Sequence, residues 1–237
     1  MNQSSQPGTA TQTDRAYAAL RAAIVRCEFA PEQRLAVEEL SQRLAMSSSP
    51  VREALSRLAA QGLVNAFEHR GFRVAPLTLE GIADLTRVRL LVETDALRDA
   101  MEAGDDRWES NLVAAAHALA LVERRLDAVS PALDDEWSTR HRSFHMAIYA
   151  GSRSPLMRQL VGQMFDSAER YRRFAGRARR VPRDKSEEHQ RLMAAIIGRD
   201  MDLAQSLVRQ HIHSTRQSVE EALIGLTRPV TAPTPAS

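Results

Sequence analysis

The stretch SSSPVREALSRLAAQGLVNAFEHRGFRVAP, residues 47–76, contains a helix start, a helix end and a hairpin in a short span. Its serines can cap a helix, Pro50 is tolerated in a first helical turn, and Gly62 lies beyond the last apolar position. The two β-prone runs that follow flank EHRG, and Pro76 closes the second run. The stretch therefore predicts one helix followed by a two-stranded hairpin.

Two more helices precede this stretch. AYAALRAAIVR predicts a helix near 14–27 that ends at the turn FAPEQ, and AVEELSQRLAM predicts another near 36–45. The short turn AMSS then joins the second helix to the third. Three helices followed by a small hairpin are the outline of a winged helix-turn-helix, in which the third helix enters the DNA major groove.

Several polar residues of this module are suited to DNA. Hydroxyls and backbone N–H groups at the start of the third helix can hold phosphate oxygens, and an arginine at a hairpin tip can enter a minor groove. The expected DNA contacts are Arg34, Ser47, Ser48, Ser49, Arg52, Arg70 and Gly71. Each has a simpler interpretation, since the serines could only cap the helix and Arg52 could pair with Glu28 or Glu53. Their combination in this order favours DNA binding.

From Thr78 onward the apolar residues recur at helical spacing. Breaks at 104–105, 130–131, 151–155, 181–182 and 198–200 divide this part into about six helices, as in a helical bundle with short connections. We expect a mainly α protein with a tail (1–13), a DNA-binding domain (14–76), a linker (77–80), an all-helical domain (81–222) and a second tail (223–237).

Composition limits the classes of protein. With 43% hydrophobic and 26% charged residues, the 237-residue chain is typical of a globular protein of one large domain or two modest ones. The net charge is only +2, so DNA contacts must come from the placement of charges. No apolar run is long enough for a membrane span, and the N-terminus lacks a signal-peptide pattern. Cys27 is the single cysteine, which excludes an internal disulfide and fits a cytoplasmic location.

Four of the seven histidines lie where a bundle could bring them together. In RHRSFHMAIY (140–149), His141 and His145 share a helix face by their i, i+4 spacing, and His189 and His211 belong to two later helices. Imidazoles on facing helices suit Zn, Ni, Co, Fe or Cu. Surface or hydrogen-bonded core histidines are the alternative, and spacing alone does not decide between them. The other three histidines are assigned no role.

Residues 20–76 resemble the GntR family of bacterial transcription regulators. The family's recognition-helix pattern Ser-x-x-Pro-Val-Arg-Glu-Ala-Leu is present in full, from Ser47 to Leu55. The chain departs from the family at Cys27 and Glu32, where glycines are usual, and at Ser48, where arginine is common. The last departure implies an operator sequence that is read differently.

Three later segments resemble the ligand-binding FCD domain that defines the FadR subfamily: VRLLVETDALRDAM, WSTRHRSFHMAIYAGSRSPLM and EEHQRLMAAIIGRDMDLAQSLVRQHI. With the N-terminal module, the resemblance covers nearly all of residues 15–220. It implies a divalent metal ion, Zn, Ni or similar, bound by His141, His145, His189 and His211. His141 stands where Asp or Asn is usual, so the expected site has no fixed negative charge and favours an anionic effector.

Two further groups of charges are expected to matter. Arg89 and Glu93 match an Arg-x-x-x-Glu of the FCD domain, where the arginine can bind an acidic effector; a surface salt bridge is the alternative. The basic run ERYRRFAGRARRVPRDK (169–185) is interpreted as a solvated helix end and loop, with a DNA or acidic-partner contact as the alternative. Tyr171 and Phe174 are expected to face the bundle.

Together these features predict a transcription regulator, expected to be a repressor. As a homodimer it would bind a roughly palindromic double-stranded DNA operator, and a small carboxylate effector would control its affinity. The alternatives are a metal-ion-sensing regulator and an all-α metal-dependent enzyme fused to a DNA-binding module. The HExxH spacing and a phosphate-binding glycine loop are both missing from the sequence, so we do not expect an enzyme.

Overall fold

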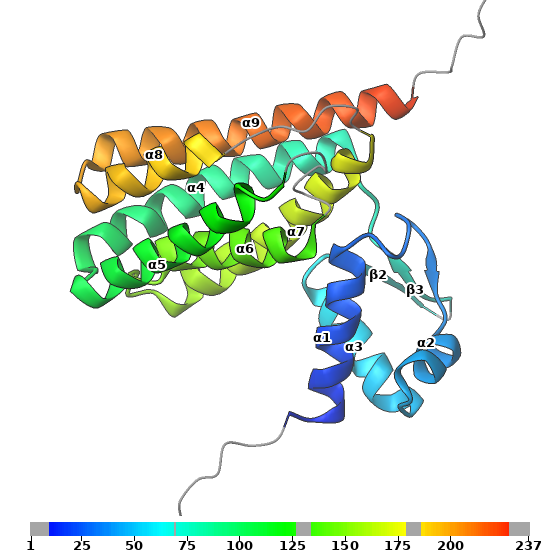
Figure 1. Ribbon diagram of the computed structural model, residues 1–237. Helices are drawn as coiled ribbons and strands as arrows, with labels where there is room; N and C mark the ends of the chain where they lie inside the picture. Colours follow the sequence, from blue (N-terminus) through cyan, green and yellow to red (C-terminus); the bar gives the residue numbers. More distant parts are fainter. Residues whose placement is uncertain (1–9, 69, 127–133, 179–185, 228–237) are drawn as a thin grey trace, which may run out of the picture. The chain divides into compact units, whose positions relative to one another are not determined.

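A computed structural model describes residues 10–68, 70–126, 134–178 and 186–227 (Figure 1). The contacts divide the chain into two compact units, Met1–Pro76 and Leu77–Ser237, and each is described by itself. Most of the expected N-terminal tail and the last ten residues of the C-terminal tail lie outside the described residues.

The first unit contains three helices and three short strands. The helices are α1 (Gln12–Val25), α2 (Val37–Leu44) and α3 (Ser48–Ala60), and the strands are β1 (Arg34–Leu35), β2 (Val64–Phe67) and β3 (Gly71–Val74). At the start of α1, Thr11 and Asp14 form a reciprocal capping box. Ser47 occupies the cap position of α3, but its hydroxyl does not bond to the helix. Capping therefore does not occupy this hydroxyl.

The strands form the wing. β3 lies between β1 and β2 in an antiparallel sheet, with Val64 opposite Val74 and Phe67 opposite Gly71. This confirms the expected hairpin and adds β1, which the sequence did not indicate because two residues are too short to show a strand period. The apolar faces of the three helices meet the sheet in one core, which includes Leu20, Ile24, Val51, Leu55 and Leu58. The unit is a winged helix-turn-helix.

Three non-glycine residues of this unit adopt left-handed backbone conformations. They are Cys27 (φ 54°), Glu32 (φ 64°) and Ala45 (φ 51°). A side chain at such a φ costs about 1–2 kcal/mol, and glycine avoids that cost. Cys27 and Glu32 are the two positions where the GntR pattern has glycine, so the departures from the pattern retain its backbone shape.

The second unit consists of helices in the described residues. They are α4 (Leu79–Ala103), α5 (Asp106–Glu123), α6 (Asp135–Tyr149), α7 (Pro155–Ala178), α8 (Ser186–Ile197) and α9 (Met201–Thr227). The expected breaks at 104–105, 151–155 and 198–200 are present, and those at 130–131 and 181–182 lie outside the described residues. Thr78, Asp105 and Asp134 cap α4, α5 and α6 with their side chains. Two boundaries differ from expectation, because α4 begins inside the expected linker and α9 continues to Thr227, five residues into the expected tail.

The helices of this unit surround one large apolar core. The long helices α4 and α9 pack along each other, α7 packs on both, and α5 lies against α6 and α8 (Figure 1). Fully buried Leu97, Leu112, Phe144, Ile148 and Ile196 belong to this core. None of the described helices is both long enough and apolar enough to cross a membrane.

The start of the basic run does not lie in solvent. On α7, Glu169, Arg170 and Arg173 are buried, and only 11% of the Arg172 side chain is exposed. The solvated interpretation is therefore wrong for residues 169–173, because Arg172 and Arg173 form ion pairs with Glu169 inside the bundle. Tyr171 is buried, as expected. Residues 179–185 of the run lie outside the described part of the chain.

Candidate functional site

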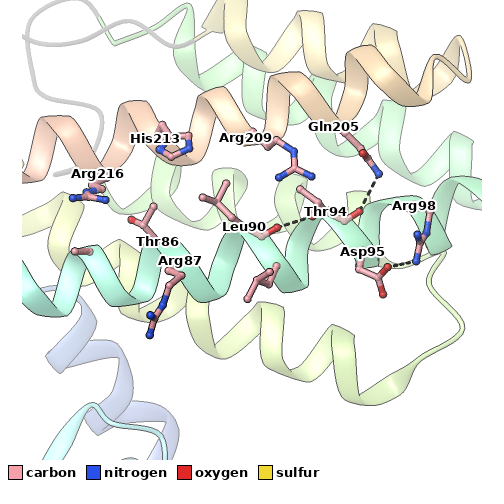
Figure 2. Close-up of a pocket in the computed structure, with 12 residues that line it drawn as sticks. Thr86, Arg87, Leu90, Thr94, Asp95, Arg98, Gln205, Arg209, His213 and Arg216 are labelled. Carbon is pink, nitrogen blue, oxygen red and sulfur yellow. Dashed lines mark hydrogen bonds and ion pairs between the residues drawn. The ribbon is translucent and has the colours of Figure 1, made fainter.

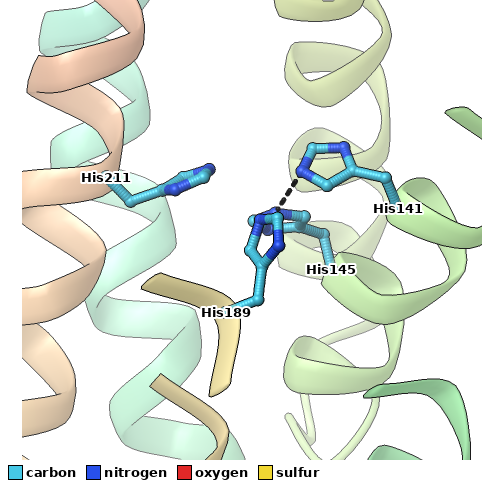
Figure 3. A group of neighbouring side chains, drawn as sticks. All are labelled: His141, His145, His189 and His211. Atoms are coloured by element: carbon cyan, nitrogen blue, oxygen red, sulfur yellow. Dashed lines mark hydrogen bonds between the residues drawn. The ribbon is translucent and has the colours of Figure 1, made fainter. Parts of the chain in front are cut away.

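Four histidines converge in the interior of the helical unit. His141 and His145 project from successive turns of α6, His189 comes from α8 and His211 from α9 (Figure 3). All four are buried, and one ring nitrogen from each lies within 4.8 Å of the others. Nε2 of His145 is 3.1 Å from Nε2 of His141. The convergence that the sequence could only suggest is therefore present, and the four imidazoles could hold a metal ion.

Two carboxylates support the cluster from outside. Oε1 of Glu123 lies 3.0 Å from Nδ1 of His189, and Oε2 of Glu188 lies 3.2 Å from Nδ1 of His211. Such contacts orient histidine ligands and make their other nitrogen a better donor to a metal. The expectation that the site lacks fixed negative charge is therefore wrong, since carboxylates stand directly behind two of its imidazoles.

An arginine that the sequence did not single out contacts His141 of the cluster. Nη1 of Arg172 is 2.8 Å from Nδ1 and 3.4 Å from Nε2 of His141. The guanidinium also pairs with Glu169 and packs over the Phe165 ring, 5.0 Å from its centre. Glu169 and Arg172 lie three residues apart on one helix, a spacing that indicates an ion pair. The excess of positive charge in the rest of the run obscured this indication.

His141 is held as a neutral ring. Its imidazole is fully buried and stacks on the Trp137 indole at a centroid distance of 4.3 Å. Burial, followed by the charge of Arg172, holds the pKa of His141 well below its ordinary value. Burial also lowers the pKa of the Arg172 guanidinium, and the charges of Arg89 and Arg173 act in the same direction, against Glu169.

The chemistry of the cluster fits a transition-metal ion. Nε2 of His189 is buried and has no hydrogen-bond partner, which is costly for a polar atom unless a ligand completes it. Neutral imidazole nitrogens are preferred ligands of Zn, Ni and Co, and carboxylates behind them strengthen the preference. The residues present therefore suit a divalent ion of this group.

Arg89 and Glu93 form a buried pair on α4. Nε of Arg89 donates to Oε1 of Glu93 at 2.6 Å, Nη2 donates to Oε2 at 3.3 Å, and the Tyr149 hydroxyl donates to Oε2 at 2.9 Å. Although burial opposes the charged form, the Glu93 carboxylate raises the pKa of Arg89. Burial, followed by the same carboxylate, raises the pKa of Tyr149 well above its usual value. The surface salt bridge considered for this pair is excluded, because both side chains are inside the bundle.

A separate groove lies between α4 and α9 (Figure 2). Its volume is about 640 Å³, and the Arg209 side chain extends from α9 toward α4. The polar residues that line it are Thr86, Arg87, Thr94, Asp95, Arg98, Gln205, Arg209, His213 and Arg216. None of the expected metal or effector residues lines this groove, so the histidine cluster is a different site.

The expected DNA contacts are exposed in the first unit. Ser47, Ser48, Ser49 and Arg52 lie at or near the start of α3. Arg70 lies at the turn of the wing, Gly71 begins β3, and Arg34 is on β1. Glu28 pairs with Arg43, and Glu53 accepts a hydrogen bond from Thr13. Within the described residues no ion pair involves Arg52, so the simple alternative of a pair with Glu28 or Glu53 is not realised.

Comparison with known proteins matches both units. The model of the family "Bacterial regulatory proteins, gntR family" matches residues 12–74, and that of the FCD domain matches residues 84–214. The chain is 36% identical over 214 residues to the HTH-type transcriptional repressor GlaR of Escherichia coli K12, covering 88% of this chain and 96% of the relative. It is 35% identical over 209 residues to the regulator BphR of Paraburkholderia xenovorans, covering 88% and 84%.

Solved structures show the same fold. E. coli McbR/YncC has a TM-score of 0.74 at 20% identity, covering 92% of this chain and all of that one. A GntR regulator of Rhodococcus sp. RHA1 has a TM-score of 0.70 at 22% identity, covering 92% and 99%. The relatives are named as regulators, which confirms that the chain is not an enzyme. This chain belongs to the GntR family of bacterial regulatory proteins and is a DNA-binding transcription regulator with an FCD domain after its winged helix-turn-helix.

Proposed function

We propose that this regulator is a repressor whose operator affinity is controlled by a small carboxylate, bound at a divalent metal centre in the FCD domain. The observation that carries the proposal is the convergence of four buried histidines beside a largely buried arginine. Repression is supported by two relatives, GlaR and RspR of E. coli, which are named as transcriptional repressors.

The DNA-binding part of the proposal rests on the exposed start of α3. Ser47, Ser48 and Ser49 offer hydroxyls and N–H groups to a phosphate, and Arg52 lies one turn further along. An arginine at this position suits a phosphate or the O6 and N7 atoms of guanine. Arg34, Arg70 and Gly71 extend the proposed contact onto the wing, where Arg70 would enter the adjacent minor groove.

The metal part of the proposal rests on the donor set. Imidazoles of His141, His145, His189 and His211 would surround a Zn, Ni or similar ion, with Glu123 and Glu188 behind two of them. Such an ion would supply a fixed positive centre for a carboxylate oxygen. The chain's own residues hold the imidazoles in place and keep water from the surrounding core.

Two arginines would recognise the anionic effector. Arg172 shares Glu169 with Arg173, so a second carboxylate can complete its set of acceptors. Arg89 is already bound by both oxygens of Glu93, and an effector would have to compete with that carboxylate. We therefore propose Arg172 as the main contact and the Arg89–Glu93 pair as a charged wall beside it.

A homodimer would join two winged modules on a roughly palindromic operator. Two-fold symmetry of the protein then matches two half-sites about one helical turn, or a multiple of it, apart. The effector must bind the arrangement that is incompetent for DNA more tightly, because equal affinity for both arrangements shifts nothing.

The proposal is tested by measuring binding to DNA from the chain's own promoter region. Metal-loaded protein is titrated with and without a series of mono-, di- and tricarboxylates, and one of them should weaken binding by about 5- to 150-fold. If the protein shows no sequence-specific binding to this DNA, the proposed operator binding is refuted. A response to the metal ion alone, with no response to any acid, would instead support a metal-ion sensor.

A further inference from the structure

We propose that the four histidines have two different roles. His145, His189 and His211 bind the ion, whereas His141 is held out of the coordination sphere by Arg172 and belongs to the effector side of the site. This rests on the proposed metal centre. It departs from the simple expectation that all four imidazoles are ligands, and it makes Arg172 the residue that sets the coordination number.

The outer ring nitrogens of the cluster do not have the same kind of partner. Nδ1 of His189 faces Glu123 at 3.0 Å and Nδ1 of His211 faces Glu188 at 3.2 Å. Nδ1 of His141 faces the guanidinium of Arg172 at 2.8 Å. Histidines that bind metal ordinarily donate their second N–H to a carboxylate or carbonyl oxygen, and a guanidinium is the opposite kind of partner.

Hydrogen positions follow from these partners. A guanidinium has only donors, so Nδ1 of His141, 2.8 Å from Nη1 of Arg172, must accept. Nε2 of His141 is then the nitrogen that donates, and its partner is Nε2 of His145, 3.1 Å away, a contact that an ion bound to His145 would replace. A protonated nitrogen has no lone pair for a metal. On His189 and His211 the carboxylates place the proton on Nδ1, which leaves a lone pair on Nε2; in His189 this Nε2 atom is buried without a hydrogen-bond partner.

Electrostatic repulsion also disfavours metal binding by His141. The Arg172 guanidinium is held in place by Glu169 and by the Phe165 and Trp137 rings, 5.0 Å and 5.8 Å away. A dication bound to His141 would lie close to this fixed positive charge in a buried region, where repulsion is weakly screened. The carboxylates of Glu123 and Glu188 attract the ion toward His189 and His211.

Three imidazole ligands leave a position on the ion for another donor. An anion in that position would also lie beside Arg172, because Arg172 and His141 border the same cluster. Effector recognition would then depend on the His141–Arg172 pair, and metal affinity on the other three histidines. The two properties are separable by substitution.

The test uses Co²⁺ alone, whose visible absorption reports the number of nitrogen ligands, on the full chain and single variants. His145→Phe, His189→Phe and His211→Phe should each weaken Co²⁺ binding by more than about 100-fold, since even outer partners of ligands cost about 10- to 100-fold. His141→Phe should keep the affinity within about threefold and leave the spectrum unchanged. His213→Ala, an exposed site on α9, is the matched control and should resemble the wild type.

Variants of Arg172 test whether its guanidinium is what keeps His141 from binding the ion. In Arg172→Met the donor is removed and His141 should join the ion, with a changed spectrum and about tenfold tighter binding; Arg172→Lys, which keeps a cationic donor, should retain the wild-type spectrum. Loss of Co²⁺ in His141→Phe, or an unchanged spectrum in Arg172→Met, would overturn the division of roles while leaving the metal centre intact. Failure of the wild type to bind Co²⁺ would overturn both.

Discussion

At the scale of single residues, the left-handed turn position Glu32 stores strain that a glycine would release. Its φ is 64° and its side chain is exposed, so replacing it removes no core contact. We expect Glu32→Gly to raise the free energy of unfolding by about 1 kcal/mol, because the strain exceeds the extra chain entropy that glycine brings. Urea titration of the purified protein measures this change.

Two companion variants separate strain from side-chain loss. Glu32→Ala truncates the same side chain without relieving the backbone, and its unfolding free energy should stay near that of the wild type. Cys27→Gly relieves similar strain but removes a buried side chain, so the two effects should largely offset each other. A glycine variant at 32 that is no more stable than the alanine variant would contradict the strain argument.

Asp99 makes the stability of the helical unit depend on pH. Its carboxylate accepts from the Ser152 hydroxyl, and from the backbone N and Nε of Arg153, at 2.7–2.8 Å. The Ser152 bond and then the Arg153 bond lower the pKa of Asp99 from 3.8 to about 2. A lowered carboxyl pKa stabilises the fold above about pH 4, and this contribution is lost as pH falls toward 2.

The Asp99→Asn variant checks that contribution. At pH 7 it should be less stable by about 1–2 kcal/mol, a figure reduced because the Arg153 partner is exposed to solvent. The difference from the wild type should shrink between pH 4 and pH 2.5 in urea titrations. Asp95→Asn, on the same helix and paired with exposed Arg98, is the control and should show only a small difference at pH 7. A constant difference for Asp99→Asn would refute the assignment.

The sequence identified the four histidines but not the groups that distinguish them. A spacing of four residues places His141 and His145 on one helix face wherever the helix lies. Glu123, Arg172 and Glu188 are near the cluster only because α5, α7 and α8 pack around it, and that packing is set by contacts far apart in the chain. The histidines of the cluster were therefore predictable from periodicity. The charged residues that contact them could be identified only from the assembled bundle.

At the scale of elements, α3 is expected to carry most of the operator contact. Arg52 lies on its exposed face and is not engaged by any described ion pair, so its charge is available to DNA. We expect Arg52→Ala to weaken operator binding by about 1–3 kcal/mol, or roughly ten- to 150-fold. Fluorescence anisotropy with labelled operator DNA, at a stated salt concentration, measures this loss.

The same helix offers a matched control. Arg57 pairs with Asp14 of α1 at 2.9 Å and lies over the Tyr17 ring, so it faces the module itself. Arg57→Gln removes an equal charge from α3 and should change operator affinity by less than about threefold, the limit expected for a charge that does not contact DNA. Equal losses in Arg52→Ala and Arg57→Gln would mean that only the total charge of the helix matters.

On α4, breaking the buried Arg89–Glu93 ion pair should lower the free energy of unfolding strongly, whereas replacing both residues with apolar ones should lower it little. Glu93→Gln leaves the Arg89 charge uncompensated, and we expect a loss of about 3–5 kcal/mol in unfolding free energy. The double variant Arg89→Met with Glu93→Leu removes both charges and should recover most of that loss. If the double variant folds but no longer responds to a carboxylate, the pair takes part in effector binding; a retained response assigns it to structure alone.

Elements were predictable wherever a pattern extends over several turns. The helix ends near 104–105, 151–155 and 198–200 follow from Gly, Pro and Asp in the sequence, and the wing follows from two β-prone runs around a turn. β1 was missed because two residues carry no period, and its pairing of Leu35 with Phe72 depends on the tertiary fold. The exact ends of α4 and α9 also differ, since helix propensity continues past the last buried residue.

At the scale of the whole molecule, control of DNA binding is a coupling between two sites. If a carboxylate lowers operator affinity by some factor, operator DNA must lower carboxylate affinity by the same factor. We expect that factor to lie between about 5 and 150, and isothermal titration of the acid with and without operator DNA measures it. Unequal factors would show that the acid acts on DNA binding by another route, such as a change in oligomeric state.

The stacking of Trp137 on His141 gives the protein an optical signal of its own. The chain has two tryptophans, and Trp137 alone has its indole against the histidine cluster, with its N–H 3.3 Å from the carboxylate that supports His189. Trp108 bonds instead to the carbonyl of Ala147, two residues after His145 on α6. Paramagnetic ions such as Co²⁺ or Ni²⁺ quench a nearby indole strongly. Occupancy of the centre is thus readable as dimmed tryptophan emission, and no label has to be attached.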